Sequence, residues 1–488
     1  MADIVVLYAH EDREKVRLLH SVLCNTAQQW SIWWDRDIAH GAWEAEAERQ
    51  ITRARCVLAF WSSASVRESS IVRKEAAFAR RHRVPLLHIF LEHVDLPMSF
   101  YNEVFTDLTG WQYQPAAPGF QDLIRRVSST LAATSALIGR PESFIANGKT
   151  LQLPSFVRSV SSYETLLSPR YSLLALALHP SSEPILVSTY DLLRSPGIDR
   201  TDISQRVSEI ADRGAAVFVD SGNYEAFRKG ERSQLQSGDS GASWAARDFH
   251  NALQEISGDL VLSYDDPFPV GKPVEIARAV ARQVAIDEKK SRGTQIIPVV
   301  HAPLVTDKRR PEELPEIIES LVKEIDCSIV AIPERELGDG VITRAKSVQN
   351  VRAVMNSSTR YRAIHLLGTG NPITLAVLAA VGADVFDGLE WCRTAIDHDT
   401  ALLHHPQHFD FFMDQCKFSE FEGVRTFTSD RTRDFRLRLL VHNLDFFHRW
   451  ITDFRSYVER GQVKEFLGMY LSEQIMAKLE SSLSGVIK

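Results

Sequence analysis

The sequence predicts an α/β protein in which a doubly wound parallel sheet is followed by a longer (β/α) barrel. Short apolar runs alternate with helix-like segments along most of the 488 residues. These runs are nearly continuous in Val, Ile and Leu, as are parallel strands that are covered on both faces. The alternation takes a longer period from about residue 140 onward. A chain of this length is also too long for one ordinary core, which predicts two or three domains.

The first sheet is predicted from three apolar strands, which lie in residues 3–12, 56–62 and 84–91. Helix-like segments separate or follow them: the first opens at the charged residues 10–13, and the others lie at residues 69–81 and 120–137. The first of these helices is amphipathic, because its apolar side chains share one face: Val16, Leu19, Val22 and Leu23. In a sheet of this kind, ligands bind beyond the carboxyl ends of the strands.

The composition is that of a globular protein, with 44% apolar and 24% charged residues. The apolar run 172–178 is far too short to cross a bilayer, and no signal peptide precedes the first strand. Five cysteines are scattered along the chain, and none form a CxxC pair. This spacing argues against a disulfide framework and a cysteine-only zinc site. We therefore expect a cytoplasmic protein without a membrane partner.

The net charge of −7 bears on possible partners. Proteins that grip a long nucleic acid usually carry a basic excess, because phosphate neutralisation supplies most of their affinity. Here the basic residues form only local clusters, at 80–83 and 308–310, which we interpret as solvated faces.

The second region contains seven apolar strand candidates, at residues 185–190, 215–220, 259–266, 296–301, 328–334, 363–370 and 383–390. Helix-like segments such as 273–290 and 311–325 fill most of the gaps. Six crossovers at this spacing favour a barrel over an open sheet. We expect one domain over residues 1–138, a linker over 139–149 and the barrel domain over 150–488.

Polar residues cluster just past the carboxyl ends of the barrel strands, where barrel enzymes keep their sites. They are Asp220, Ser221, Asp265, Asp266, His301, Glu334, Gly368, Gly370, Asp387 and Glu390. A turn Asp is common at such a position. So many carboxylates on one rim would repel one another unless a ligand or function required them. The pattern therefore predicts a ligand site.

The first region resembles a bacterial TIR domain over roughly residues 1–135. The resemblance rests on an ordered set of segments: VVLYAHED, WWDRDIAHGAW, FWSSASVRES, RKEAAFA and FTDLTGW. It implies a flavodoxin-like sheet with helices on both faces. Members of this family either assemble through TIR–TIR contacts or cleave NAD⁺ at the nicotinamide–ribose bond.

The resemblance places the family's catalytic glutamate at Glu75. Many enzymatic members carry a tryptophan one helical turn earlier, where Ile71 stands here. The residues expected to bind the substrate are Tyr8, His10, Trp34, Asp35 and Trp43. Cleavage of a bond between nitrogen and an anomeric carbon develops oxocarbenium character, which a nearby carboxylate in a dry pocket stabilises. The alternative interpretation makes Glu75 a solvated helix residue and the tryptophans packing residues.

The second region resembles the tRNA-guanine transglycosylase (queuine tRNA-ribosyltransferase) family from about residue 141 to the end. The segments that carry the resemblance are LPSFVRSV (153–160), VDSGNYE (219–225), YDDPFP (264–269), HLLGTGNP (365–372), GADVFDGLEWCR (382–393) and the tail from residue 441. It implies a TIM (β/α)8 barrel that exchanges guanine for a deazaguanine base.

This resemblance places the nucleophile at Asp387, the general base at Asp220 and the base-recognising carboxylate at Asp265. It also implies ligand contacts from Ser221, His301, Gly368, Gly370 and Arg393. Asp387 could attack the ribose anomeric carbon while Asp220 shuttles the proton of the incoming base. The alternative is that Asp387 caps the turn after its strand.

Three departures from the family pattern stand out. The second glycine of its DSGG motif is Asn223, and His301 replaces the glutamine that helps to read the base. The family's zinc ligands are a CxCxxC run and a histidine, of which His442 alone is retained. Cys416, near His404, His405 and His408, is a poor substitute, so we expect no zinc.

The sequence leaves three hypotheses. In the first, the TIR domain hydrolyses NAD⁺ through Glu75 in anti-phage defence, and the barrel senses or processes a nucleobase, tRNA or DNA. Self-association through TIR contacts would then order the BB loop (35–41) and complete the site. In the second, the barrel exchanges bases through Asp387 and the TIR domain serves only in assembly. In the third, both sites are silent and the protein is a scaffold.

Overall fold

The computed structural model forms two compact units, residues 1–138 and 139–483, which are described separately below. The described residues are 3–24, 30–34, 47–48, 50–51, 54, 56–67, 70–81, 84–96, 100, 105–138, 140–162, 168–194, 200–228, 244–256, 258–291, 293–356 and 360–483. Within these residues, no helix is both long and apolar enough to cross a membrane.

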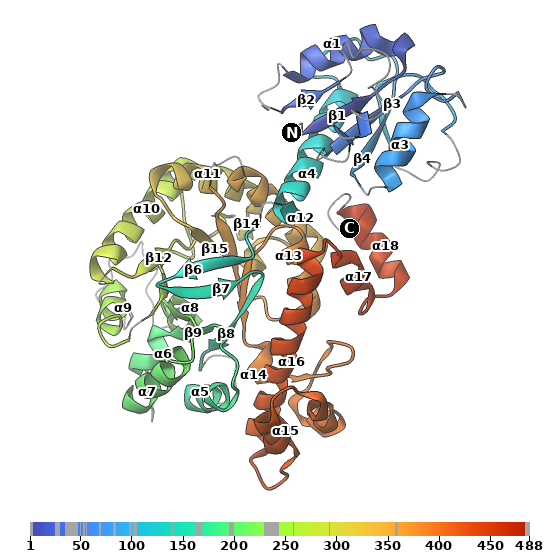
Figure 1. The fold of residues 1–488 in the computed structure, drawn as a ribbon. Helices are drawn as coiled ribbons and strands as arrows, with labels where there is room; N and C mark the ends of the chain where they lie inside the picture. Colours follow the sequence, from blue (N-terminus) through green and yellow to red (C-terminus); the bar gives the residue numbers. More distant parts are fainter. Residues whose placement is uncertain are drawn as a thin grey trace. The chain divides into compact units, whose positions relative to one another are not determined.

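The first unit is a parallel five-stranded sheet in the order β2-β1-β3-β4-β5 (Figure 1). Its strands are β1 (Ile4–Leu7), β2 (Ile32–Trp33), β3 (Cys56–Trp61), β4 (Leu86–Phe90) and β5 (Phe105–Asp107). The helices are α1 (Arg13–Cys24), α3 (Ile71–Arg81) and α4 (Pro118–Ile138). The predicted flavodoxin-like sheet is therefore confirmed.

The period-two alternation of side chains explains why this sheet is covered on both faces. Ile4 and Val6 belong to a core cluster with residues of α1 and α4, whereas Val5 and Leu7 belong to a second cluster with residues of α3. All four side chains are nearly inaccessible to solvent. Burial of one such side chain contributes about 1.5–3 kcal/mol, which ties the helices to both faces.

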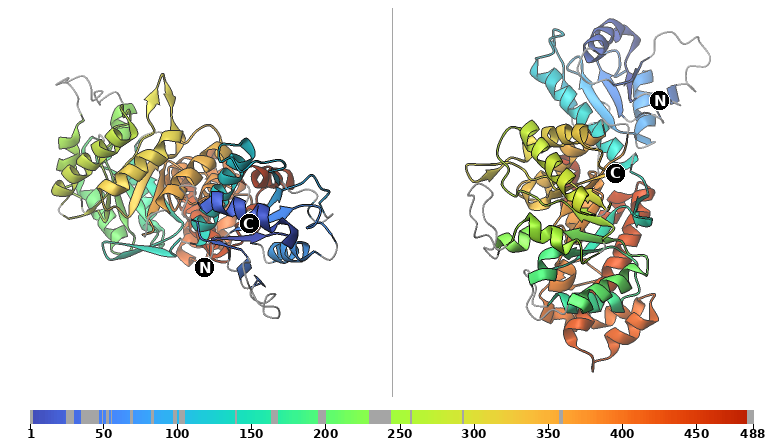
Figure 2. Two further views of the ribbon diagram at one scale, coloured as in Figure 1. Left: turned by 90° about the horizontal axis from the view of Figure 1, so that it is seen from above. Right: turned by 90° about the vertical axis from the view of Figure 1, so that its left-hand side faces the viewer.

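The second unit is a barrel of eight parallel strands, seen from two further directions in Figure 2. In sheet order they are β12 (Gln295–Ile297), β11 (Leu260–Leu262), β10 (Val217–Asp220), β9 (Ile185–Ser188), β8 (Ser155–Val160), β17 (Val385–Gly388), β16 (Ala363–Leu367) and β15 (Ile329–Pro333). A bridge between Val299 and Ala331 joins the two end strands. This confirms the predicted barrel.

Apolar side chains from every strand fill the barrel interior, among them Phe218, Leu262 and Val385. The helices of the outer layer are α5 (Pro169–Leu178), α6 (Thr189–Arg194), α7 (Arg200–Ala211), α8 (Asn223–Arg228), α9 (Ala246–Ala252), α10 (Pro273–Lys290), α11 (Leu314–Glu324), α12 (Val341–Met355), α13 (Pro372–Ala380) and α14 (Glu390–Arg393). A filled interior leaves the rim at the carboxyl ends of the strands as the place for a site.

The segment predicted as a linker contains ordered structure. β6 (Ser143–Ala146) and β7 (Lys149–Gln152) form an antiparallel hairpin around Asn147-Gly148, the strongest short hairpin signal in a sequence. Ala146 and Leu151 join the core cluster of the barrel strands. The hairpin therefore belongs to the barrel unit.

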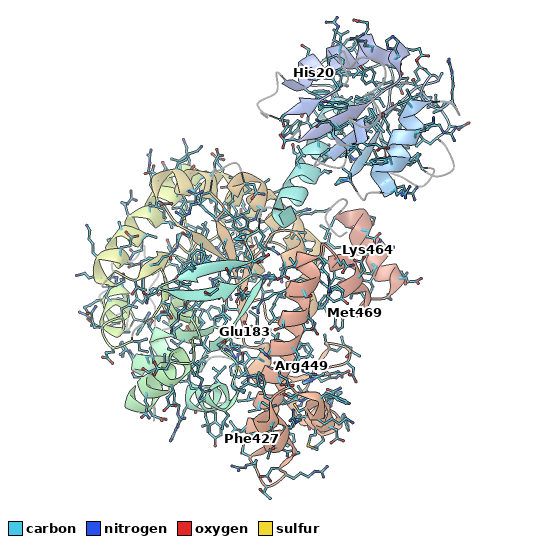
Figure 3. The ribbon with its side chains drawn as sticks, in the orientation of Figure 1. His20, Glu183, Phe427, Arg449, Lys464 and Met469 are labelled. Atoms are coloured by element: carbon cyan, nitrogen blue, oxygen red, sulfur yellow. The ribbon has the colours of Figure 1, made fainter. Side chains whose placement is uncertain are left out.

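The carboxyl-terminal segment is helical: α15 (Glu422–Ser429), α16 (Phe435–Glu459), α17 (Val463–Gly468) and α18 (Glu473–Ser482). Phe447 of α16 stacks on Phe156 of β8 with ring centroids 4.1 Å apart. Arg455 forms two hydrogen bonds, of 2.7 and 2.9 Å, to the carboxylate of Glu183, which is labelled in Figure 3. These contacts hold α16 against the barrel.

Candidate functional site

Asp387 is the penultimate residue of β17 and is held by groups from both neighbouring strands. Its Oδ2 accepts a hydrogen bond from Ser159 Oγ of β8 at 2.9 Å. Its Oδ1 lies 3.1 Å from His365 Nε2 of β16 and accepts from the Gly368 amide at 3.3 Å. His365 is fully buried, and its Nδ1 has no hydrogen-bond partner within the described residues. The neutral tautomer with its proton on Nε2 satisfies this geometry and fixes the carboxylate as an acceptor.

Asp220 ends β10, and its surroundings favour the protonated form. Burial raises the pKa of Asp220 well above its usual value, and the charges of Glu225, Asp265 and Asp387 raise it further. One carboxylate oxygen accepts from the Gly222 amide at 2.9 Å. Gly222 has φ +72°, and a Cβ on it would lie 2.6 Å from Tyr190 Cβ, so this turn requires glycine. Asp220 therefore keeps its proton to a higher pH than an exposed aspartate does.

Asp265 is engaged on both of its oxygens. Oδ1 accepts from Ser221 Oγ at 2.9 Å and from Asn223 Nδ2 at 2.7 Å. Oδ2 lies 2.7 Å from His301 Nε2. The sequence-predicted residues Asp265, Ser221 and His301 thus meet at one point of the rim, and Asn223, known only as a departure from the family pattern, joins them.

His301 bridges Asp265 to a second carboxylate. Its Nδ1 lies 3.0 Å from Glu336 Oε1, which also pairs with Arg309 at 2.9 Å. Burial alone would lower the pKa of His301, but the charges and hydrogen bonds of Glu336 and Asp265 raise it to about 9. His301 is therefore an imidazolium at neutral pH, and the two carboxylates are balanced by two cations. Sequence analysis missed Glu336, which lies in a short 3₁₀ helix after β15.

Glu225 is a further buried carboxylate that sequence analysis missed as a site residue. Its Oε1 accepts from Ser161 Oγ at 2.7 Å. Burial and the charge of Asp191 raise the pKa of Glu225 to about 7. Asp191 in turn accepts from the Ser162 amide at 2.6 Å. The rim therefore carries more carboxyl groups than the strand-end pattern indicates. One of them, Glu225, is partly protonated near neutral pH.

We expect the Glu225→Gln variant to be less sensitive to alkaline pH than the wild type. A carboxyl whose pKa is raised by folding, here from 4.5 to about 7, stabilises the fold below pH 4.5 and loses this contribution as pH rises through 7. The variant should match the wild type near pH 5 and exceed its unfolding free energy by about 1–3 kcal/mol at pH 8. Urea unfolding of the barrel at both pH values measures this, and equal pH dependence in the two proteins would contradict it.

Gly370 and Gly388 allow Glu390 to approach the backbone. A Cβ on Gly370 would lie 1.7 Å from Glu390 Oε2, so no larger residue fits there without moving Glu390. Glu390 Oε1 accepts from Arg393 Nη2 at 2.5 Å. Two other rim acids have structural contacts: Asp266 caps the Phe268 amide at 3.0 Å, and Glu334 pairs with Arg344 at 2.6 Å.

In the TIR unit, Glu75 is partly buried on α3, and Ile71, one turn earlier, is 48% exposed. Trp34 is buried in the core, where its ring lies 6.0 Å from that of Tyr8. His10 is exposed. The predicted residues Asp35 and Trp43, like the BB loop, lie outside the described residues.

A polar cluster that sequence analysis missed lies at the carboxyl ends of this sheet. Ser62, just after β3, donates to Asp12, and burial raises the pKa of Asp12. Glu92, just after β4, accepts from the Ser63 amide at 3.0 Å and from Lys15 at 2.9 Å. These residues line the edge at which doubly wound sheets bind their ligands.

Comparison with known proteins finds a matching family model for each of the two units. A TIR domain family model matches residues 4–124. The family model described as queuine tRNA-ribosyltransferase matches residues 144–474, more than half of the chain. The chain belongs to the queuine tRNA-ribosyltransferase family.

Relatives of the transferase unit include archaeal tRNA-guanine(15) transglycosylases. The protein of Thermococcus kodakarensis is 21% identical over 341 residues, which cover 67% of this chain and 53% of the relative. The proteins of Thermococcus onnurineus and Pyrococcus furiosus are 21% and 20% identical, with the same coverage. The chain thus spans about half the length of these curated relatives.

The zinc site implied by the transferase resemblance can be tested against the residues present. His398, Cys416 and His442 bring potential ligand atoms within 4.8 Å of one another. The histidine that joins Cys416 in this group is therefore His398, and not His404, His405 or His408 as the sequence analysis considered. His398 Nε2 lies 3.0 Å from the carbonyl oxygen of His442, and Arg449, labelled in Figure 3, donates to His398 Nδ1. With both its nitrogens engaged and a cation beside it, His398 is a poor ligand. A four-coordinate zinc does not fit this set.

We expect the purified protein to contain far less than one zinc per chain and to keep its melting temperature in EDTA. A structural zinc contributes about 10–16 kcal/mol in small zinc domains, so its removal would be obvious. Elemental analysis and thermal unfolding with and without chelator check this. One equivalent of zinc together with a lower melting temperature in EDTA would contradict it.

Proposed function

We propose that this protein cleaves NAD⁺ at the nicotinamide–ribose bond, with Glu75 as the catalytic carboxylate. The observation that carries the proposal is the partly buried position of Glu75 on α3 in a unit that matches the TIR domain model. The sequence resemblance expects the catalytic glutamate at this residue. As the bond from C1′ to the pyridinium nitrogen breaks, the electron pair leaves with nicotinamide and the ribose becomes oxocarbenium-like. The Glu75 carboxylate stabilises that charge, and water then adds to C1′, giving ADP-ribose and a proton.

The barrel, in this proposal, binds a nucleobase or nucleic acid as the trigger. The state of Asp265 supports a binding role, because Ser221, Asn223 and His301 already occupy its oxygens. A guanine that used this carboxylate would compete with the imidazolium of His301. Loss of a charge-assisted hydrogen bond in a buried site is unfavourable, which argues against ready exchange of that base.

TIR–TIR contacts complete the proposed active site. The trigger would act by favouring the assembled state. NAD⁺ depletion after such a trigger is suited to defence against phage, which we propose as the setting.

The test is incubation of the full-length protein with NAD⁺ alone and with tRNA, single-stranded DNA, guanine or 7-deazaguanine, with the products resolved by chromatography. We expect equimolar nicotinamide and ADP-ribose, released faster with one of the candidate triggers. Intact NAD⁺ in every mixture, at protein concentrations where self-association is verified, would contradict the proposal.

Base exchange in the barrel is a second candidate, favoured by the way Asp387 is held. Ser159, His365 and the Gly368 amide fix its carboxylate, and the raised pKa of Asp220 suits a proton carrier. An Asp387 oxygen would bond to C1′ as the bond to the departing base breaks, and protonated Asp220 would give its proton to that base and become ionised. The incoming base would lose its ring proton to ionised Asp220 and displace Asp387 from C1′.

Incorporation of labelled guanine or deazaguanine into tRNA or DNA separates the two candidates. Incorporation that Asp387→Asn abolishes, without any release of nicotinamide, would favour the barrel as the enzyme. Nicotinamide release without incorporation would favour the TIR unit.

A further inference from the structure

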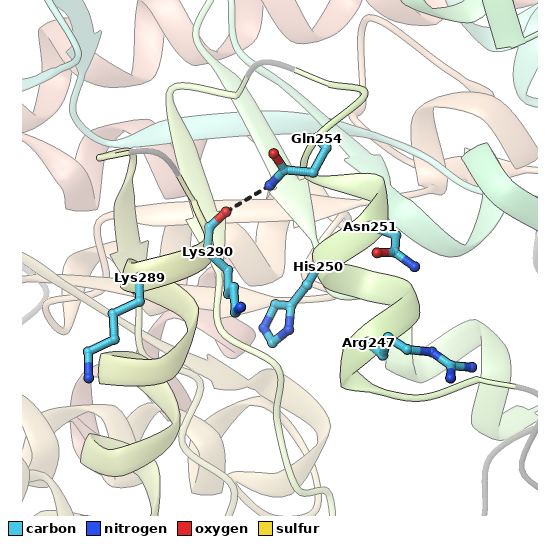
Figure 4. A pocket seen from close by; sticks show the side chains of 6 residues that line it. All are labelled: Arg247, His250, Asn251, Gln254, Lys289 and Lys290. Atoms are coloured by element: carbon cyan, nitrogen blue, oxygen red, sulfur yellow. Dashed lines mark hydrogen bonds between the residues drawn. The ribbon is translucent and has the colours of Figure 1, made fainter.

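A cavity of about 580 Å³ lies on the outside of the barrel between α9 and the end of α10 (Figure 4). Its lining residues share one property, since each side chain carries a hydrogen-bond donor: Arg247, His250, Asn251, Gln254, Lys289 and Lys290. Neither proposed reaction uses any of them. A cavity with cations and amides on its walls and no lining carboxylate favours an anion.

The cations of this cavity are not neutralised by the protein. Within the part of the chain that the structure describes, Arg247, Lys289 and Lys290 form no ion pair. On the same helix α10, Arg278 does pair, with Glu324 at 3.4 Å. The chain has 63 acidic and 56 basic residues, so cations gathered without acidic partners are unexpected for a merely solvated face. Like charges gathered in this way repel one another until an anion joins them.

His250 is fixed in the cavity wall by a buried carboxylate. Its Nε2 lies 2.8 Å from Asp287 Oδ1, and Asp287 is fully buried. The other oxygen of Asp287 accepts from the amide of Tyr264 at 2.8 Å. Since Asp265 is the next residue, the cavity wall is continuous with the segment that carries the rim carboxylate. The second ring nitrogen of His250 has no hydrogen-bond partner in the described part of the chain and remains available to a ligand.

Gln254 lines the cavity with an uncharged side chain. Its amide donates to the carbonyl oxygen of Lys290 at 3.0 Å, as the dashed line in Figure 4 shows. This bond ties the end of α9 to the end of α10 and satisfies a carbonyl that would otherwise repel an anion at the helix terminus. In Figure 4, Lys290 lies beside His250 between the two helices, and Arg247 extends from α9.

We propose that this cavity binds a phosphate group. A phosphate oxygen accepts from guanidinium, ammonium and amide donors together, and arginine can engage two oxygens at once. The phosphate could belong to a nucleic-acid strand or to a free nucleotide. The chemistry is shared, and the experiment separates the two sources. The proposal goes beyond NAD⁺ cleavage and base exchange, and its outcome is independent of both.

The test uses the full-length protein and two probes, a fluorescent single-stranded ten-nucleotide oligonucleotide followed by anisotropy, and GMP followed by calorimetry. The charge-reversed variant is Lys289→Glu/Lys290→Glu, and the conservative variant is Lys289→Arg/Lys290→Arg. A matched control, Lys346→Glu/Lys478→Glu, makes the same charge change at exposed sites on α12 and α18. Equal melting temperatures verify that each variant is folded.

We expect the charge-reversed variant to bind at least one probe 10-fold or more weakly, while the arginine variant and the matched control stay within about twofold. If the oligonucleotide is affected, its salt slope should also fall, by about one to two, because each lost phosphate contact on a single strand removes about 0.7 from the slope. Loss for the oligonucleotide assigns the site to a strand, and loss for GMP alone assigns it to a nucleotide. The proposal is overturned if the charge-reversed variant binds both probes as tightly as the matched control does. It is also overturned if the wild type binds neither probe measurably.

Discussion

Replacing Glu75 by glutamine is expected to lower the rate of nicotinamide release by about 100- to 1000-fold, the usual effect of removing one preorganised electrostatic group from a transition state. Glutamine keeps the shape of the side chain but not the charge that faces the developing oxocarbenium ion. KM for NAD⁺ should change little, because the interaction is made chiefly in the transition state. Initial rates of nicotinamide release over a range of NAD⁺ concentrations measure both parameters.

The control for this variant is Glu14→Gln on α1, a matched substitution at a glutamate that pairs with Arg17 on the surface at 3.0 Å. It should retain the wild-type rate. A Glu75→Gln protein that is folded and releases nicotinamide at the wild-type rate would remove Glu75 from the chemistry.

Replacing Asp384 by alanine is expected to destabilise the barrel by about 3–5 kcal/mol, the range for breaking a buried ion pair. Asp384 is fully buried and accepts from Arg140 at 2.8 Å and from Arg352 at 2.5 Å. It also accepts from the Tyr361 hydroxyl at 2.6 Å and the Ile364 amide at 2.8 Å. Without the carboxylate, two buried guanidinium groups lose their counter-charge. The urea-unfolding transition of the barrel measures the loss.

Asp326→Ala is the matched control for Asp384→Ala. Asp326 pairs with Arg360 at 3.1 Å, but the two side chains are 76% and 52% exposed. An exposed pair contributes about 0–1 kcal/mol, so this variant should unfold nearly as the wild type does. Equal destabilisation by the two substitutions would show that the buried cluster around Asp384 does not anchor the barrel.

The architecture was predictable because burial on both faces leaves a strong pattern. Runs such as Cys56–Trp61 and Ile329–Pro333 are apolar at every position, and each forms a parallel strand. The sequence predicts a linker over 139–149, whereas Ser143–Ala146 and Lys149–Gln152 pair as a hairpin. Its partly polar strands gain their stability from packing against the barrel core, which no local pattern reveals.

The candidate site was predictable where residues lie at the carboxyl end of a strand, as Asp220 and Asp387 do. Ser159 and His365 were not predicted as site residues because they lie inside strands. Only the register of β8, β17 and β16 brings them to Asp387. Glu336 was missed because it reaches His301 from a turn after another strand. The protonated state of His301 depends on both carboxylates and could not be read from the motif alone.

The central claim is that the Glu75 carboxylate lies against the ribose whose bond to nicotinamide breaks. A crystal structure of the assembled protein with a non-hydrolysable NAD⁺ analogue tests it most directly. We expect a Glu75 carboxylate oxygen about 3–3.5 Å from C1′ or from a hydroxyl of that ribose, the distance of a reactive arrangement. An analogue bound with its nicotinamide ribose away from α3, and with Glu75 facing solvent, would contradict the claim.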